Sequence, residues 1–396
     1  MAGTDTGIEA PPQGPPTDAP KDDQAGQKKK ASIGEKISQF FAKLKMSGVG
    51  AGGSSSSVIG LSVGSSSVKV VELIKKGKSF HLHHFGLAQL PEDAVINREI
   101  INPVAVIEAI KSLVAQIQIA SRPVCTSISG NAVFIKRLTV EAPNQRELKE
   151  AVYWEAEQYL PFDPSEVVLD FHQIGKRDKT FDVLLVGAKR SAVESYVGCI
   201  EDAGLKAKQV DVDFFAMQDS FELNYPQNPA EAVCLVDVGA SSTKISIVQE
   251  GVPVFTKDSP MGGAALTAEI QKQLNLNFTD AETLKTGAAA GGVPQEVSDL
   301  MAASAEQIAG EIKQTLEVYH ATGTGAPVAY VLVSGGGSKV PQFAKIVEDG
   351  CGLPTQVANP FNAISYDSGV FTQEYLAQIA PLAAVPVGLA LRAAQG

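Results

Sequence analysis

Cysteine is scarce in this sequence of 396 residues, and the four cysteines are far apart. Cys125, Cys199, Cys234 and Cys351 form no CxxC pair, so their spacing argues against a zinc site and against a disulfide framework. We therefore expect four reduced, buried thiols in a protein of the cytoplasm.

Long apolar runs are absent as well. No stretch approaches the roughly 18 apolar residues of a membrane span, and residues 1–23 are polar and acidic, unlike a signal peptide. Basic residues number 33 against 44 acidic ones, which gives a net charge of -11. Phosphate contacts need clustered lysine and arginine, so we expect no nucleic-acid partner.

Two widespread nucleotide motifs are missing too. The P-loop pattern GxxxxGKS/T does not occur, and no GxGxxG follows the first predicted strand, which argues against a Rossmann dinucleotide site. Spacing identifies neither a Ser-His-Asp nor a Cys-His arrangement, nor an acid/base pair. The sequence therefore assigns no catalytic residue.

Residues 1–57 differ in composition from the rest. Ile33, Ile37, Phe40, Phe41 and Leu44 follow a proline-rich stretch, keep helical spacing and lie among lysines. This predicts a basic amphipathic helix over residues 33–45 on a Gly/Ser-rich tether, which would contact an anionic membrane surface. The alternatives are a short helix docked on the protein itself or a partly disordered leader.

From residue 58 onward, strand and helix patterns alternate. Strands are predicted at 58–63, 69–75, 79–90, 124–129, 135–140, 167–175, 181–188, 206–212, 232–238, 244–250, 253–258 and 328–334. Helices are predicted at 103–119, 144–160, 191–203, 263–274, 298–322, 341–349 and 374–394, the last with a break near Pro381 or Pro386. Strands followed by helices, twice over, indicate an α/β architecture in two related halves.

A short duplication is the strongest signal. Residues 62–69, SVGSSSVK, match residues 237–244, DVGASSTK, and each copy joins two apolar strands. Glycine lets the backbone turn tightly, successive N–H groups can form an anion-binding nest, and serine and lysine add donors. Two such turns, one from each half, would clamp the phosphates of a nucleotide. The alternative is a pair of tight hairpins with serine as turn filler.

Two weaker patterns accompany the duplication. A third glycine cluster, residues 334–338, follows an apolar strand and would approach an adenosine with bare backbone; a plain strand-to-helix loop is the alternative. His81, His83 and His84 lie close together, and on a regular strand His81 and His83 would share a face. No third metal ligand is evident, so we interpret them as a solvated strand face.

The paired turns and the later glycine cluster resemble those of the actin-like ATPase superfamily. Residues 154–162, WEAEQYLPF, resemble the WEAEQYIPF signature of the PilM family of type IV pilus assembly proteins. Residues 280–285 are similar to that family's AExLK segment, and residues 262–267 to its GGxxLT pattern. The resemblance extends from about residue 58 to the C-terminus.

The resemblance implies an actin-like fold of two ribonuclease-H-like lobes. Its expected parts are a leader (1–57), a first core (58–129), an inserted FtsA-type subdomain (130–205), a return to the first core (206–228), a second core (229–276), a helical cap (277–327), and a second core with closing helix (328–396).

It also implies ATP between the lobes and a magnesium ion held through water by Asp237. The phosphate contacts would be Ser65, Ser66, Ser67, Lys69, Asp237, Gly239, Ala240, Ser241, Ser242 and Lys244. Gly262 and Gly263 would lie near sugar or phosphates, Glu282 and Lys285 near ribose or base, and Gly335, Gly336, Gly337 and Ser338 near adenosine. Ser62 stands where the superfamily usually has Asp, which removes a charge from the metal's shell, so we expect ATP binding with slow or undetectable hydrolysis.

PilM family members bind the cytoplasmic N-terminal peptide of PilN, and indirectly PilO and the pilus assembly ATPase, at the inner membrane. The resemblance places that groove between the first core and the inserted subdomain, near Trp154, Tyr159 and Phe162. For these aromatics, core packing is the alternative. The competing functions are a sugar or acid kinase of the same fold and an FtsA-like membrane-tethered filament protein. Whether the chain forms a homo-oligomer stays open.

Overall fold

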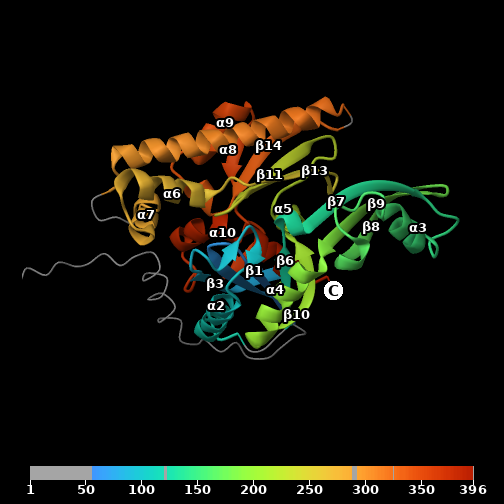
Figure 1. The fold of residues 1–396 in the computed structure, drawn as a ribbon, viewed down its shortest axis with the longest axis horizontal. Coiled ribbons are helices and arrows are strands. Elements are labelled where there is room, and N and C mark those ends of the chain that lie inside the picture. Colours follow the sequence, from blue (N-terminus) through green and yellow to red (C-terminus); the bar gives the residue numbers. More distant parts are fainter. Residues whose placement is uncertain (1–55, 120–122, 288–291, 324, 396) are drawn as a thin grey trace, which may run out of the picture.

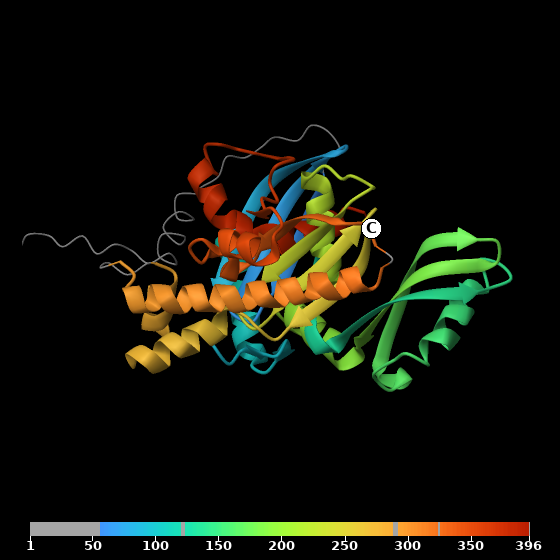
Figure 2. The same ribbon diagram turned by 90° about the horizontal axis from the view of Figure 1, so that it is seen from above.

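The computed structural model describes residues 56–119, 123–287, 292–323 and 325–395. Two twisted sheets with their helices form the body, and a third, smaller sheet projects from one side (Figures 1 and 2). The mixed α/β architecture predicted from the sequence is confirmed. The predicted amphipathic helix at 33–45 lies outside the described residues.

The first sheet has the strand order β10-β6-β1-β2-β3-β16. Its strands are β1 (Ser56–Val63), β2 (Ser67–Lys76), β3 (Ser79–Gln89), β6 (Pro123–Ile128), β10 (Lys206–Val212) and β16 (Ile364–Tyr366). β1, β2 and β3 form an antiparallel meander, whereas β6 and β10 join in parallel. Helices α2 (Pro103–Gln116) and α4 (Arg190–Asp202) cover one face, where their apolar side chains form a buried cluster with those of the strands.

The second sheet repeats this plan. Its order is β13-β12-β11-β14-β15, from β11 (Ala232–Val238), β12 (Thr243–Gln249), β13 (Val252–Ser259), β14 (Val328–Ser334) and β15 (Thr355–Val357). β11, β12 and β13 form an antiparallel meander like β1, β2 and β3. β14 and β15 join in parallel, as β6 and β10 do in the first sheet. Helices α8 (Gln295–Ala321) and α9 (Phe343–Cys351) cover one face, and α6 (Gly263–Leu274) and α7 (Phe278–Lys285) pack against α8. The duplication seen in the sequence is therefore a duplication of topology.

The projecting sheet is inserted between β6 and β10. It consists of β7 (Val133–Glu141), β9 (Thr180–Lys189) and β8 (Val167–Arg177), covered by α3 (Leu148–Ala156). α3 begins later than the predicted 144 because the Asn144 side chain accepts the N–H groups of Arg146 and Glu147, which favours a turn. Short elements elsewhere are β4 (Val95–Ile96), β5 (Glu99–Ile100), η1 (Gly130–Ala132), η2 (Pro164–Glu166) and η3 (Gly336–Lys339).

Two helices lie between the large sheets. α5 (Asp213–Asn224) was not predicted, because it is buried on most of its circumference and so lacks one apolar stripe. α10 (Gln373–Ala393) packs against α5 and against strands of both sheets. Residues 328–396 were expected to belong to the second core. β16 pairs with β3, and α10 packs on β1 and β2, so the end of this segment returns to the first sheet.

The predicted break in α10 is wrong, because the helix continues through Pro381 and Pro386. Packing on both sides holds it together, and the Pro381 carbonyl accepts the Gly335 N–H at 2.6 Å. Among the described helices, α10 alone is long and apolar enough to cross a membrane, with a mean hydropathy of 1.5. Most of that stretch, 72%, is buried inside the protein, as in the core helix of a globular domain.

Candidate functional site between the lobes

The two duplicated turns meet at the interface of the large sheets. In each, a glycine N–H donates to a carbonyl across the turn: Gly64 to Ser67 at 3.0 Å and Gly239 to Ser242 at 2.9 Å. The hydroxyls of Ser65 and Ser241 hydrogen bond to each other at 2.6 Å. Two segments far apart in sequence therefore converge with equivalent geometry.

The predicted third glycine cluster packs against the second turn. Gly335 has φ +84°, and a Cβ there would lie 2.3 Å from the Val238 carbonyl oxygen. A Cβ on Gly337 would meet the Val238 side chain at 2.3 Å, whereas a Cβ on Gly336 would make only an ordinary contact, with Leu382 at 3.7 Å. Ser338 is buried and its hydroxyl donates to the Gly335 carbonyl at 2.8 Å, so this side chain caps its own turn.

The start of α6 lies on the other side of the second turn. The N–H of Gly263 donates to the Gly239 carbonyl at 3.0 Å, and a Cβ on Gly262 would lie 2.5 Å from the Ala240 oxygen. Lys285 of α7 donates to the Gly263 carbonyl at 3.2 Å and forms an ion pair with Glu282. These predicted residues of the second lobe are thus neighbours, and the backbone packing at Gly262 leaves no room for a side chain there.

Lys244 is the most buried charge of the site. Its ammonium lies 3.1 Å from Asp213 of α5 and 3.3 Å from Asp237. Burial alone would raise the pKa of Asp213, but Lys244, Arg98 and a hydrogen bond from Ser127 hold it below its ordinary value. The sequence assigned Lys244 to a phosphate, whereas in this structure it joins carboxylates of the two lobes.

Lys69 has the equivalent place in the first hairpin but a different environment. Ser62 stands opposite it where Asp237 stands opposite Lys244. Desolvation lowers the pKa of Lys69; Asp237 opposes this shift, while Lys244 and Arg98 add to it. An anionic group placed beside Lys69 would favour its charged form again.

Arg98, which sequence reasoning missed, completes the positive charge. It sits at φ +68° between β4 and β5, donates to the Ser242 hydroxyl at 3.1 Å and lies 3.9 Å from Asp213. Its Nε is buried without a hydrogen-bond partner among the described residues. No motif surrounds Arg98, so no sequence signal marked it. Lys69 and Arg98, with the hydroxyls and the bare glycine backbone, can together bind a chain of phosphates.

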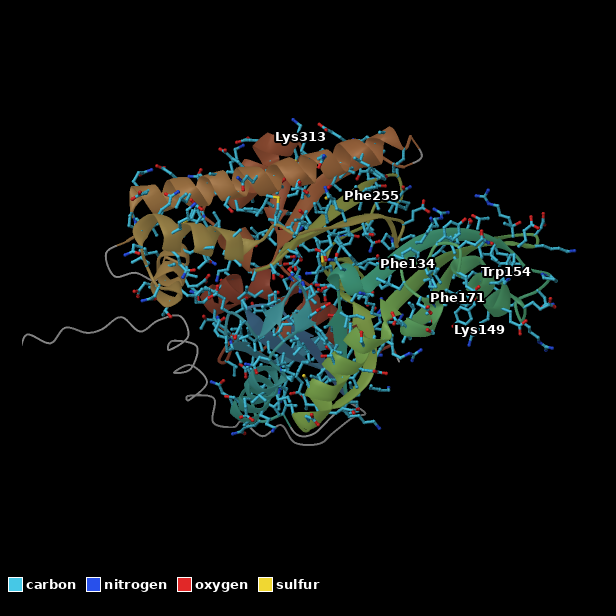
Figure 3. All side chains as sticks on the ribbon, in the orientation of Figure 1. Phe134, Lys149, Trp154, Phe171, Phe255 and Lys313 are labelled. Atoms are coloured by element: carbon cyan, nitrogen blue, oxygen red, sulfur yellow. The ribbon has the colours of Figure 1, made fainter. Side chains whose placement is uncertain are left out.

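The aromatics assigned to a partner groove lie on the projecting subdomain. Trp154 is 71% exposed, because α3 buries the opposite face, so core packing is excluded for it (Figure 3). Tyr159 and Phe162 lie beneath the ammonium groups of Lys136 and Lys189, 3.9 Å and 4.8 Å from the ring centres.

A cavity of about 150 Å³ opens closer to the lobes. Its lining residues are Gly130, Val133, Ile135, Phe214, Thr256 and Asp258. They come from the inserted sheet, from α5 and from β13, so the cavity touches both lobes and the subdomain. Both carboxylate oxygens of Asp258 are buried without a hydrogen-bond partner within the described part of the chain. Trp154, Tyr159 and Phe162 do not line this cavity.

Two sheets of the same topology that face each other through equivalent turns define a two-lobed, actin-like fold. Within that class, residues 60–394 match the family model described as type IV pilus assembly protein PilM, and the chain belongs to this family.

The chain is also similar to several solved structures and curated proteins. The structure titled "PilM-PilN type IV pilus biogenesis complex" is 28% identical, with a TM-score of 0.76 over 85% of this chain and 98% of that one. The ethanolamine utilization protein EutJ from Carboxydothermus hydrogenoformans shares the fold. Its TM-score is 0.54 and its identity is 16%, and the match covers 85% of this chain and 89% of EutJ. Cell division protein FtsA of Neisseria meningitidis is 24% identical over 50% of this chain and 54% of its own length. FtsA of Bacillus subtilis is 25% identical over 32% of this chain and 28% of its own length. The matched part of this chain thus spans about half or less of the length of these curated relatives.

Proposed function

We propose that this protein is an ATP-binding scaffold of type IV pilus assembly that binds the N-terminal peptide of PilN at the cytoplasmic side of the inner membrane. The observation that carries the proposal is the match to the PilM–PilN complex, which extends over nearly the whole of that chain. PilO and the assembly ATPase would be reached through PilN. Nothing among the described residues favours the kinase alternative, and the matches to FtsA cover only part of each chain.

The residues between the lobes fit a nucleotide. Gly262, Gly335 and Gly337 let three segments pack closely around the second turn, at Ala240 and Val238, with no side chain of their own in the way. Lys69 is desolvated and the Nε of Arg98 has no hydrogen-bond partner among the described residues, so a bound anion would stabilise both cations. When bound, ATP with Mg²⁺ would supply that negative charge. Asp237 would hold the hydrated metal, and Ser62 would leave the first hairpin without its matching carboxylate.

The cavity beside Asp258 fits one anchor of a peptide. Val133, Ile135 and Phe214 offer apolar contacts, while the carboxylate of Asp258 offers two acceptors to a cation or to backbone N–H groups. Trp154, Tyr159 and Phe162 remain candidates for a second contact on the same subdomain.

Titration calorimetry with a synthetic PilN N-terminal peptide tests the partner. We expect one peptide per chain. Asp258→Asn should weaken binding about 10-fold or more, since it removes a charge-assisted hydrogen bond of about 1.5–3 kcal/mol. Asp170→Asn, on the exposed side of β8, is the matched control and should leave the affinity unchanged. If the wild-type protein binds no peptide, the proposed function is wrong.

Titration with ATP tests the nucleotide separately. Binding without release of ADP over hours would fit a ligand that sets the state of the scaffold. Rapid Mg²⁺-dependent turnover would contradict the role given to Ser62, and ADP release that depends on an added sugar would favour the kinase.

A further inference from the structure

A cluster of potential metal ligands lies on β2 and β3, outside the site between the lobes. Glu72, His83 and His84 each offer one ligand atom, and these atoms all lie within 4.8 Å of one another. Glu72 is 3% exposed, His84 is partly buried, and His83 is exposed. The cluster therefore has a buried carboxylate, Glu72, on one side and an exposed imidazole, His83, on the other.

A β-bulge brings the two histidines together. Glu72 pairs with His84, but the next residue, Leu73, pairs with Leu82, so His83 is the additional residue on β3. On a regular strand neighbouring side chains point to opposite faces, and a bulge redirects one of them. The two imidazole rings accordingly lie 4.1 Å apart.

Within the strand face that we interpreted from His81, His83 and His84, the group of potential ligand atoms does not include His81. The Nδ1 of His81 instead lies 3.1 Å from the hydroxyl of Ser365 on β16. The third ligand that the sequence did not reveal is Glu72, which belongs to the preceding strand and is brought in by the pairing of β2 with β3.

The Glu72 carboxylate already has two polar neighbours, because Ser57 donates a hydrogen bond to Oε1 and the His84 ring contacts Oε2. His84 Nδ1 lies 2.7 Å from Glu72 Oε2, and a metal ion bound by both groups would replace this hydrogen bond. Two imidazoles and one carboxylate are a typical ligand set for zinc and related ions.

We propose that Glu72, His83 and His84 form a binding site for a divalent transition metal of the zinc class. Metal binding would bring the three ligand atoms, which lie within 4.8 Å of one another, to about 2.0–2.1 Å from the ion. Water would complete the coordination on the open side. Because Ser57 of β1 donates to Glu72, the bound ion would tie together the first three strands of the first lobe. This inference does not depend on nucleotide or PilN binding.

Titration of metal-free, tag-free protein with Zn²⁺ tests the site. We expect one ion per chain, with the affinity lowered at least about 10-fold in His83→Gln, in His84→Gln and in Glu72→Gln. His81→Gln is the matched control on the same strand and should bind as the wild type does. His83 is exposed, so its replacement should leave the circular dichroism and melting of the metal-free protein unchanged even if Glu72→Gln unfolds.

Co²⁺ as a spectroscopic substitute separates this site from the cysteines. We expect d–d bands without a thiolate charge-transfer band. The proposal is overturned if the wild type binds no Zn²⁺, if His83→Gln and His84→Gln bind it unchanged, if His81→Gln weakens it equally, or if thiolate bands show that cysteine is the ligand.

Discussion

Lys244→Met would separate a structural lysine from a ligand-binding one. Lys244 is 1% exposed and pairs with Asp213 and Asp237. At an effective dielectric constant of about 20, charges 3.1 Å and 3.3 Å apart attract by roughly 5 kcal/mol each. Desolvation offsets much of this, but removing Lys244 leaves Asp213 with only the more distant Arg98, at 3.9 Å, and takes from Asp237 its ion pair at 3.3 Å. We therefore expect unfolding free energy to fall by about 3–5 kcal/mol.

Lys69→Met is the matched perturbation in the other hairpin. Lys69 makes no ion pair among the described residues, and desolvation lowers its pKa. Removing the lysine therefore removes a desolvation cost that is about as large as the favourable interactions that are lost with it. We expect a stability change within about 1 kcal/mol. ATP affinity should fall about 10-fold or more, the equivalent of one charge-assisted hydrogen bond.

Urea unfolding followed by circular dichroism measures the first quantity, and calorimetric titration with ATP the second. The reasoning predicts opposite profiles: one variant is unstable, and the other is stable but binds ATP poorly. Equal losses of stability in the two variants would refute the distinction between the lysines, and unchanged ATP affinity in Lys69→Met would refute the phosphate contact.

Three further outcomes follow from the same geometry. Ser62→Asp should raise the pKa of Lys69 and make ATP affinity depend more on Mg²⁺, measured by calorimetry with and without the metal; an unchanged dependence would contradict it. Gly335→Ala should cost at least about 1–3 kcal/mol and abolish ATP binding, because φ +84° with ψ 167° is a conformation that residues other than glycine rarely adopt. Gly336→Ala, whose Cβ would meet its nearest neighbour at 3.7 Å, should have only a small effect in thermal melts. Burial raises the pKa of Asp219 to about 7. The positive charge of Arg392 lowers this pKa, whereas the negative charges of Asp211 and Glu222 raise it. The folded state therefore holds a proton that the unfolded state releases near pH 4, so stability should fall as pH rises from about 4 to about 7, and Asp219→Asn should flatten that slope.

The turns could be predicted because their information is local. Residues 62–69 and 237–244 carry the same short pattern between apolar strands, and tight turns depend on a few adjacent residues. Their contact through Ser65 and Ser241 followed from assuming that two similar halves face each other, which the paired topology confirms.

Other features depend on contacts far along the chain and could not be predicted. Arg98 reaches the site only because its turn adopts a positive φ and the other lobe supplies Ser242. α5 is buried on most sides, so it shows no helical stripe. The grouping of His83 with His84 requires a bulge, which depends on how β3 pairs with β2.

The lobes are already held by their own contacts, and this sets how a nucleotide could act. Ser65–Ser241, Arg98–Ser242 and Asp213–Lys244 all cross between the lobes. Phosphates entering between the turns must replace at least the first two contacts, so ATP would favour a different spacing of the lobes. The cavity beside Asp258 is lined from both lobes and would change with that spacing. We therefore expect ATP to alter peptide affinity, and the peptide to alter ATP affinity by the same factor, in paired calorimetric titrations. Equal peptide affinities with and without ATP would mean that the lobes keep one spacing and that the phosphates bind at the edge of the turns.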